Sequence, residues 1–162
     1  MEDKTYYLEM HDRSEVIASR KTKEIEIKDM AGKPEFNQRM YCEVGEQWQW
    51  IDRREWSAEQ WAEYLADGDH RTYAGYVGGV EIGYFELDCV EGQVEIVYFG
   101  LLPSAIGQGI GGQFLTACLE QAWKVEGAQR VWVHTCTLDH EYALASYQSR
   151  GLKLYDTVNE IV

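Results

Sequence analysis

One stretch of the chain decides the fold, and it reads Leu101-Leu102-Pro103-Ser104-Ala105-Ile106-Gly107-Gln108-Gly109-Ile110-Gly111-Gly112-Gln113. The apolar residues before the glycines are typical of a strand, and the spacing of apolar residues after them is typical of an amphipathic helix. Backbone N–H groups are exposed where such a helix begins, and the helix dipole favours negative charge at the same point. The stretch therefore predicts a cradle for a phosphate group.

Several kinds of phosphate site contain a glycine cluster. The spacing Gly107-x-Gly109-x-x-Gly112 matches the dinucleotide-binding fingerprint. However, the cluster lies late in the chain, follows predicted hairpins rather than βαβ units, and lacks the acidic residue expected at the end of the following strand. A P-loop is excluded because Gln113 stands where Gly-Lys-Ser/Thr is required. A turn needed only for tight packing remains an alternative.

The rest of the chain alternates between strand-like and helix-like segments. Strands are predicted over 5–10 and 24–29, helices over 34–45 and 57–68, and an antiparallel meander over 71–77, 80–88 and 93–102. The glycine cluster is followed by a helix ending near Gly127, a strand over 130–136, a helix from Asp139 to Gly151 and a strand over 152–158. This order predicts an α/β (α+β) fold, with helices flanking a mixed central sheet of about six to seven strands.

Two of these predictions depend on short motifs. Ser57-Ala58-Glu59-Gln60 is a capping box, which predicts that a helix begins directly after Ser57. Gly78-Gly79 separates two strand-like runs, which is typical of a tight hairpin turn.

The length and charge of the chain limit its classes of function. We expect the 162 residues to form a single domain over 1–162, with N-terminal strands of uncertain placement within 1–33. Lys and Arg number 15 against 28 Asp and Glu, so the net charge of −13 argues against nucleic acid and anionic membranes as partners. The same charge would attract a cationic small substrate, or it serves solubility alone.

Location and metal content are expected from a few features. The N-terminus is charged where a signal peptide becomes apolar, and no apolar run is long enough to span a bilayer. The four cysteines are widely spaced and form no CxxC pair, so we expect reduced thiols in a cytoplasmic protein. His134, Cys136 and His140 lie close enough in sequence for a zinc site, but no zinc spacing pattern fits, and we expect no metal.

Two separated motifs then point to a family. The first follows a strand and precedes a helix, and it reads Ile106-Gly107-Gln108-Gly109-Ile110-Gly111. The second reads His140-Glu141-Tyr142-Ala143-Leu144-Ala145-Ser146-Tyr147-Gln148-Ser149-Arg150-Gly151-Leu152. The segment 94–152 thereby resembles the GNAT superfamily of acetyl-CoA-dependent N-acetyltransferases, whose motifs are Arg/Gln-x-x-Gly-x-Gly/Ala and a pattern close to Asn-x-x-Ala-x-x-x-Tyr-x-x-x-Gly-Phe. The resemblance implies a GNAT-like fold with residues 94–152 as the cofactor-binding core.

The resemblance also implies acetyl-CoA as the co-substrate. The residues it assigns to acetyl-CoA are Leu101, Leu102, Gly107, Gln108, Gly109, Ile110, Gly111, Gly112, His140 and Tyr147. Ile106 replaces the Arg or Gln of the family motif, so backbone donors from Gln108 to Gly112 would carry more of the contact with the pyrophosphate. His140 replaces the usual Asn and can still donate a hydrogen bond to the pantetheine arm.

Three catalytic roles follow from the resemblance. Glu95 occupies a position similar to that of the catalytic glutamate in the histone-acetyltransferase branch, and it would act as the general base. The backbone N–H of Leu102, with Leu101 beside it, would stabilise the oxyanion. Tyr147 holds the position of the general acid that protonates the leaving thiolate. The alternatives are an ordinary polar residue on a strand for Glu95 and a core tyrosine for Tyr147.

The surroundings of Glu95 favour its role as a base. Strand alternation predicts that Val97 and Phe99 share its face. An apolar setting raises the pKa of a carboxyl group and so suits a base that operates near neutral pH.

The acceptor site is predicted from the early helices, which border the acceptor side in GNAT folds. Aromatic residues and carboxylates gather between residues 43 and 64, and together they can bind a cationic amine. Trp48 and Trp50 are the candidates there, and His134 and Thr135 are candidates from the strand after the cofactor helix. An aromatic core with a solvated acidic face is the alternative.

The resulting hypothesis is an N-acetyltransferase that acts on a primary amine, either a small molecule or a lysine or N-terminal amine. The alternative is a non-catalytic acyl-CoA-binding sensor or scaffold, and an NAD-dependent dehydrogenase is a more distant one. The resemblance also allows a homodimer, since dimers are common in the family.

Overall fold

A mixed sheet forms the centre of the molecule. The computed structural model describes residues 2–46, 50, 52–66, 68–136 and 143–161. Among them, seven strands form one sheet in the order β2-β3-β4-β5-β6-β1-β7. The strands are β1 (Glu2–Met10), β2 (Glu26–Asp29), β3 (His70–Val77), β4 (Val80–Val90), β5 (Gln93–Leu101), β6 (Arg130–Cys136) and β7 (Lys153–Ile161). The helices are α1 (Pro34–Gly45), α2 (Ala58–Leu65), α3 (Gly111–Trp123) and α4 (Ala143–Ser149). The predicted α/β class and the mixed sheet are confirmed.

Local signals place several of these elements where the sequence predicts them. Pro34 is the first residue of α1, where its missing N–H costs nothing. Ser57 caps α2 and forms the predicted capping box with Gln60. The β3–β4 hairpin turns at Gly78 and Gly79, which have φ angles of 57° and 82° that other residues rarely adopt. Within the described residues, every helix is too short or too polar to cross a membrane.

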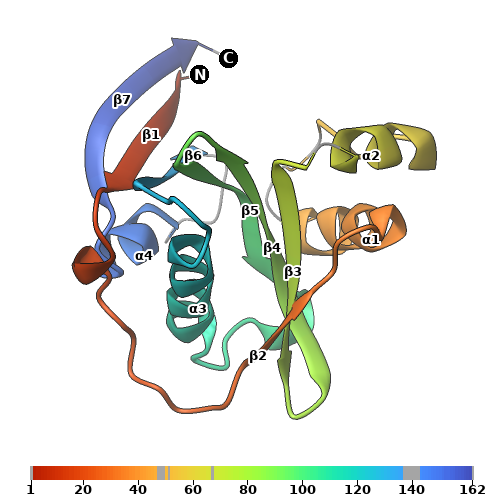
Figure 1. Cartoon of the computed structure of the whole chain (residues 1–162), viewed down its shortest axis with the longest axis horizontal. Coiled ribbons are helices and arrows are strands. Elements are labelled where there is room, and N and C mark those ends of the chain that lie inside the picture. The colour runs from red at the N-terminus through yellow and green to blue at the C-terminus, as the bar shows by residue number, and fades with distance from the viewer. Residues whose placement is uncertain (1, 47–49, 51, 67, 137–142, 162) are drawn as a thin grey trace.

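The helices cover the two faces of the sheet (Figure 1). On one face, Met40 and Val44 of α1 pack with Tyr84 of β4 in a small apolar cluster. On the other face, α3 lies over the main core, where the Phe114 ring lies 5.7 Å from the Phe85 ring and 5.1 Å from the Phe99 ring, between centroids. The α4 helix packs on the same side as α3, because Tyr147 belongs to this main core.

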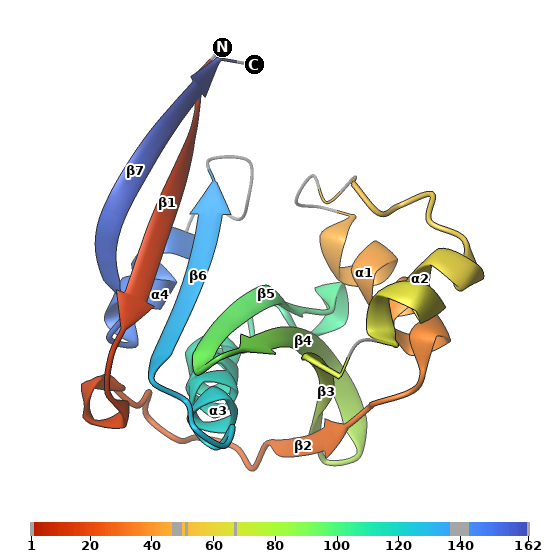
Figure 2. The ribbon, with the colours of Figure 1, turned by 45° about the horizontal axis from the view of Figure 1, so that its top comes forward.

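The strands β5 and β6 diverge at a β-bulge. They are parallel and pair from Gln93–Ile96 to Arg130–Val133. The register between β4 and β5 shifts so that Ile96 and Tyr98 face consecutive residues of β4, which leaves Val97 as an extra residue. A bulge bends its strand, and beyond Val97 the ribbon of β5 turns away from β6 (Figure 2).

Because of the bulge, the Phe99 side chain of β5 lies on the opposite face of the sheet from the one predicted. Glu95 pairs with Asp88, whereas Phe99 pairs with Phe85, and these two partners lie on opposite faces of β4. The prediction that Phe99 shares the face of Glu95 was therefore wrong. Simple alternation fails because the extra residue Val97 reverses the side on which every later side chain of β5 points.

The N-terminal strand lies among the C-terminal strands. β1 is antiparallel to both β6 and β7 and lies between them (Figure 2). Its side chains Leu8 and Met10 are buried in the main core. The segment that follows crosses the outside of α3, where the N–H of Ser19 donates to Thr116 Oγ1 (3.0 Å). Nearby, the Gln113 side chain accepts from the N–H of Thr22 (3.1 Å). The two strands expected within 1–33 therefore belong to opposite halves of one sheet: β2 forms one edge, and β1 lies between β6 and β7.

The crossing segment depends on Gly151, which ends α4. Gly151 has φ of 106°, and a Cβ at this position would overlap the backbone carbonyl oxygen of Glu15. We expect Gly151→Ala to lower the free energy of unfolding by about 2–3 kcal/mol, through backbone strain and this overlap. Urea denaturation measures the loss. Gly68→Ala is the matched control, since a Cβ there meets nothing within 4 Å; equal stability of the two variants would contradict this account.

Candidate functional site

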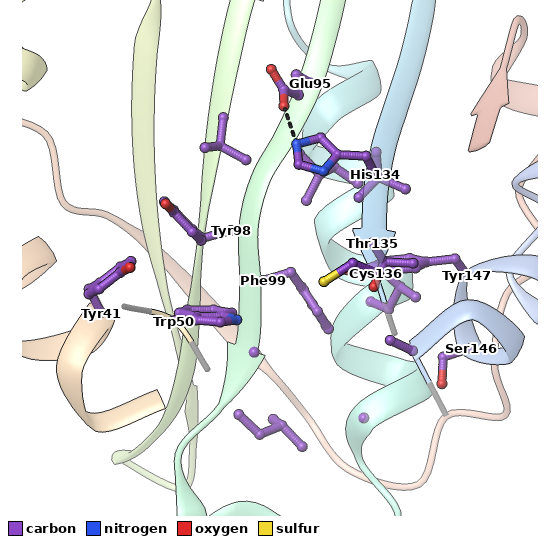
Figure 3. A pocket seen from close by; sticks show the side chains of 18 of the residues that line it. Tyr41, Trp50, Glu95, Tyr98, Phe99, His134, Thr135, Cys136, Ser146 and Tyr147 are labelled. Carbon is purple, nitrogen blue, oxygen red and sulfur yellow. Dashed lines mark ion pairs between the residues drawn. The ribbon is translucent and has the colours of Figure 1, made fainter. Parts of the chain in front are cut away.

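A cavity of about 700 Å³ lies where β5 and β6 separate (Figure 3). Its walls come from both sides of that separation, from the start of α3, from α4 and from the region around α1 and α2. The lining includes Tyr41, Trp50, Arg53, Tyr64, His70, Asp88, Glu95, Tyr98, Phe99, Leu101, Ile106, Gly107, Gly111, Gly112, His134, Thr135, Cys136, Ser146 and Tyr147. One hollow therefore connects the glycine cluster to the aromatic residues of the predicted acceptor side.

The glycine cluster forms one end of this cavity. Gly107 and Gly109 have φ angles of 84° and 75°, which turn the chain sharply into α3. Ile110 occupies the N-cap of α3, and its apolar side chain cannot accept a hydrogen bond from the first turn. Gly111 lines the cavity, and a Cβ there would lie 3.7 Å from Leu101 Cδ1. The helix thus presents uncapped N–H groups beside a wall without side chains, which suits an anion.

The other residues predicted to bind acetyl-CoA are placed differently. Gln108, Gly109 and Ile110 lie outside the lining. The Gln108 side chain donates to the Ser104 carbonyl oxygen (2.8 Å) and so stabilises the turn, while Ile110 is buried in the main core. Gly112 lines the cavity, and His140 falls outside the residues that the structure describes.

Tyr147 reaches the cavity from α4. The residue is 8% exposed, and its side chain extends from α4 toward the side of the cavity formed by β6 (Figure 3). The position agrees with both hypotheses made from the sequence, since the ring belongs to the main core while the residue also lines the cavity.

Leu102 is not available for the oxyanion role predicted for it. Its N–H donates to the carbonyl oxygen of Ile82 (2.8 Å), so this donor points toward β4. The N–H groups of a strand alternate between its two edges, which directs the N–H of Leu101 toward the gap beside β6. The sequence does not reveal this, because the direction of a backbone N–H depends on strand pairing rather than on distance from Pro103.

Glu95 occupies the opposite part of the cavity from the glycine cluster. Its carboxylate is 20% exposed, and Oε2 lies 3.6 Å from His134 Nε2, which is too long for a hydrogen bond (Figure 3). Burial, and then the negative charge of Asp88, raise the pKa of Glu95 from 4.5 to about 7, although Arg53 opposes this shift. A carboxyl group with this pKa can exchange a proton near neutral pH.

Aromatic rings form the acceptor end of the cavity. The Trp50 and Tyr98 rings have centroids 5.0 Å apart, and the Tyr41 ring lies 5.2 Å from that of Tyr98 (Figure 3). His134 and Thr135 line the facing wall on β6. The structure therefore brings Trp50, His134 and Thr135 to one cavity with Glu95, while Trp48 lies outside the described residues.

Two arginines near the cavity were not singled out from the sequence. Arg53 lines the acceptor end. The guanidinium carbon of Arg150 would lie 4.0 Å from a Cβ on Gly112, which places a cation at the start of α3. Nothing in the spacing between Arg150 and the glycine cluster signals this placement. Within the described ranges, no group of three or more His, Cys, Asp or Glu side chains is placed to hold a metal ion.

Comparison with known families and structures agrees with this geometry. A model of the acetyltransferase (GNAT) family matches residues 26–152. A search of curated proteins finds no match. Two similar solved structures are GCN5-related N-acetyltransferases, one from Kribbella flavida (18% identity, TM-score 0.67) and one from Sphaerobacter thermophilus (12% identity, TM-score 0.73). Each match covers 96% of this chain, but 56% and 49% of those chains, so this chain spans about half of their length.

A third similar structure is an aminoglycoside acetyltransferase from an uncultured soil metagenomic sample, in complex with sisomicin. It is 17% identical with a TM-score of 0.59, and the match covers 78% of this chain and 87% of that chain. At these identities the likeness is one of fold. β1 precedes the part of the chain that the family model matches.

Proposed function

We propose, since this chain belongs to the GNAT family of acetyltransferases, that it transfers an acetyl group from acetyl-CoA to a primary amine. The observation that carries the proposal is the single cavity lined both by Gly111, at the uncapped start of α3, and by Glu95. The first suits the phosphates of acetyl-CoA, and the second suits the removal of a proton from the attacking amine.

The reaction needs a neutral amine. An alkyl ammonium group with a pKa near 10.4 costs about 4–5 kcal/mol to deprotonate at neutral pH. Glu95, directly or through a water molecule, takes the proton from the nitrogen as the new N–C bond forms. The C–S bond of the thioester breaks, and the hydroxyl of Tyr147 gives its proton to the departing sulfur. The products are an N-acetyl amine and coenzyme A.

Two parts of the chain would hold acetyl-CoA and stabilise its reacting thioester. The uncapped first turn of α3 would face the phosphates, because the helix dipole favours anions there. The N–H of Leu101, rather than that of Leu102, would donate to the developing oxyanion. The strand and the chemical role are those expected from the sequence, and only the donor residue changes, from Leu102 to Leu101.

The acceptor is a small-molecule amine or a lysine or N-terminal amine of a peptide. Similar structures include an aminoglycoside acetyltransferase and a chimera of a spermidine N-acetyltransferase from Vibrio cholerae, which supports a small amine. The net charge of −13 favours a substrate that carries positive charge. A cytoplasmic location, a homodimer and the absence of nucleic-acid and membrane partners stay predictions.

The experiment is incubation of the protein with acetyl-CoA and a panel of amines, with release of the free thiol as the measurement. We expect release that depends on the amine. The alternative function, a non-catalytic acyl-CoA sensor or scaffold, is favoured by Ile106 at the place of the family Arg or Gln. Tight binding of coenzyme A without turnover of any amine would establish that alternative.

Tyr147→Phe tests the role of the general acid. We expect kcat to fall about tenfold, because loss of one proton donor removes part of the usual acid–base contribution. The affinity for coenzyme A should change little, since the ring remains. Tyr73→Phe is the control, because Tyr73 is a buried tyrosine outside the cavity lining. If Tyr147→Phe retains the wild-type kcat, Tyr147 is a core tyrosine only.

A further inference from the structure

A buried arginine lies at the acceptor end of the cavity, surrounded by rings. The side chain of Arg53 is 17% exposed, and its residue lines the cavity. Its guanidinium carbon lies 4.1 Å from the ring centroid of Tyr64, 4.6 Å from that of Trp56 and 5.0 Å from that of Tyr98. Aromatic faces attract a cation, but they do not accept the directed hydrogen bonds that guanidinium N–H groups make.

Glu86 carries the buried negative charge that faces Arg53, and it approaches the guanidinium group only at a long distance. Its Nη1 lies 4.0 Å from Oε1 of Glu86, beyond hydrogen-bond distance. Among the residues that the structure describes, this buried Nη1 has no hydrogen-bond partner. The Tyr64 hydroxyl instead donates to Glu86 (3.1 Å), and Glu86 itself is 1% exposed.

A purely structural ion pair would be built differently. Burying a guanidinium is costly unless its donors are paired, and an apolar side chain of similar size is often at least as stable. Nη1 itself is enclosed, but the Arg53 side chain is 17% exposed and lines the cavity, so part of this cationic side chain reaches a space that a ligand can enter. A carboxylate matches the planar fork of a guanidinium, because its two oxygens can accept two parallel N–H···O hydrogen bonds.

We propose that Arg53 binds a carboxylate of the acceptor, so that the substrate is an amino acid rather than a polyamine or an aminoglycoside. This proposal rests on the proposed function and names its substrate class. An amino acid carries an amine and a carboxylate, and the cavity offers a charge of opposite sign to each. The carboxylates of Glu95 and Asp88 lie on the neighbouring strands β5 and β4, where the amine would be bound. Arg53 supplies the positive charge for the carboxylate, and it lies close enough to Glu95 to lower the pKa of that carboxyl group. A polyamine carries no anionic group that could pair with Arg53.

The experiment compares amines that differ only in a carboxylate. The pairs are lysine and cadaverine, ornithine and putrescine, and phenylalanine and phenethylamine. For at least one pair, we expect the wild-type kcat/KM to be at least about tenfold higher for the amino acid, as loss of one charged hydrogen bond predicts. Equal or higher kcat/KM for the decarboxylated member of every pair would overturn the proposal.

Variants of the pocket show whether Arg53 causes the preference. Arg53→Gln should remove the preference for the amino acid, and Arg54→Gln, an exposed neighbour with the same charge change, should retain it. Since Arg53→Gln leaves Glu86 buried without its cation, the double variant Arg53→Met, Glu86→Gln removes both charges and guards against misfolding. Glu86→Gln alone keeps the cation and should keep the preference. A preference that survives both Arg53 variants in folded protein would overturn the proposal.

A binding measurement separates this proposal from the proposed function. Trp56 and Trp61 lie beside Arg53, so a carboxylate bound there should change tryptophan fluorescence. If no amine is acetylated, the proposed function fails, and titration with each amine pair still tests the site. A fluorescence change with the amino acid that Arg53→Gln abolishes supports the carboxylate site. An equal change with both members of each pair, or none with either, overturns it.

Discussion

Glu95→Gln lowers kcat/KM for the acceptor amine about a hundredfold to a thousandfold at pH 7.5, within the usual contribution of a general base. Glutamine has nearly the same shape but cannot take the proton from the amine. The substitution should leave the affinity for coenzyme A unchanged, because the glycine cluster proposed to bind the phosphates lies at the other end of the cavity. Initial rates of thiol release and a coenzyme A titration measure the two effects.

The pH dependence gives the same prediction a sharper form. The pKa of Glu95 is about 7, and only the deprotonated carboxylate acts as a base. Wild-type kcat/KM should therefore fall as the pH drops through about 7, and Glu95→Gln should lack this acidic limb. Glu120→Gln, on the exposed side of α3, is the control and should keep it. An acidic limb that persists unchanged in Glu95→Gln would assign the base to another group.

The raised pKa also affects stability. A carboxyl group whose folded-state pKa is raised stabilises the fold when protonated, and that contribution is lost as the pH rises through the folded-state value. The shift from 4.5 to about 7 corresponds to about 3 kcal/mol at about 1.4 kcal/mol per unit. Glu95→Gln should accordingly be more stable than the wild type at pH 8.5, and the advantage should shrink as the pH falls through about 7 and vanish below the unfolded-state pKa of about 4.5. The burial that raises the pKa of Glu95, and would suit it to act as a base near neutral pH, therefore lowers the stability of the fold at higher pH.

Local signals made much of the fold predictable. The capping box at Ser57, Pro34 at the start of α1 and the turn at Gly78 act through neighbouring residues, so the sequence shows them directly. The position of β1 depends on pairing with β6 and β7, which follow it by more than a hundred residues. The alternating apolar residues of β1 predict a strand, but they do not indicate which strands it pairs with.

The site was predictable to the same extent. Motif spacing indicated Glu95, Gly111 and Tyr147, and the structure brings all three to one cavity. The errors arose where backbone pairing decides direction, as with the N–H of Leu102 and the face of Phe99. Arg53 was missed because only its burial beside the cavity marks it as a candidate site residue. An arginine next to Arg54, in an acidic and aromatic segment, gives no sign in the sequence that it is buried.

Gly111→Val should weaken the binding of coenzyme A more than about a hundredfold, the second large effect expected here. Its own neighbourhood can accept a β-carbon, since a Cβ would meet Leu101 Cδ1 at 3.7 Å, an ordinary contact. The two methyl groups of valine would then extend into the cavity at the first turn of α3. Because Ile106 offers no polar side chain, the pyrophosphate in the proposed binding mode would depend on close approach to these backbone N–H groups. Loss of that approach removes several charge-assisted hydrogen bonds together.

Gly111 is a sharper test than Gly109. A side chain at Gly109 would strain the backbone at its φ of 75°, so loss of binding could follow from a distorted turn. Ala117→Val is the matched control, since it adds a β-branched side chain to the same helix away from the cavity lining. Calorimetric titration with coenzyme A and thermal unfolding are measured on both variants. Wild-type affinity in a folded Gly111→Val protein would show that the glycine cluster serves the turn alone, and that the phosphates bind elsewhere.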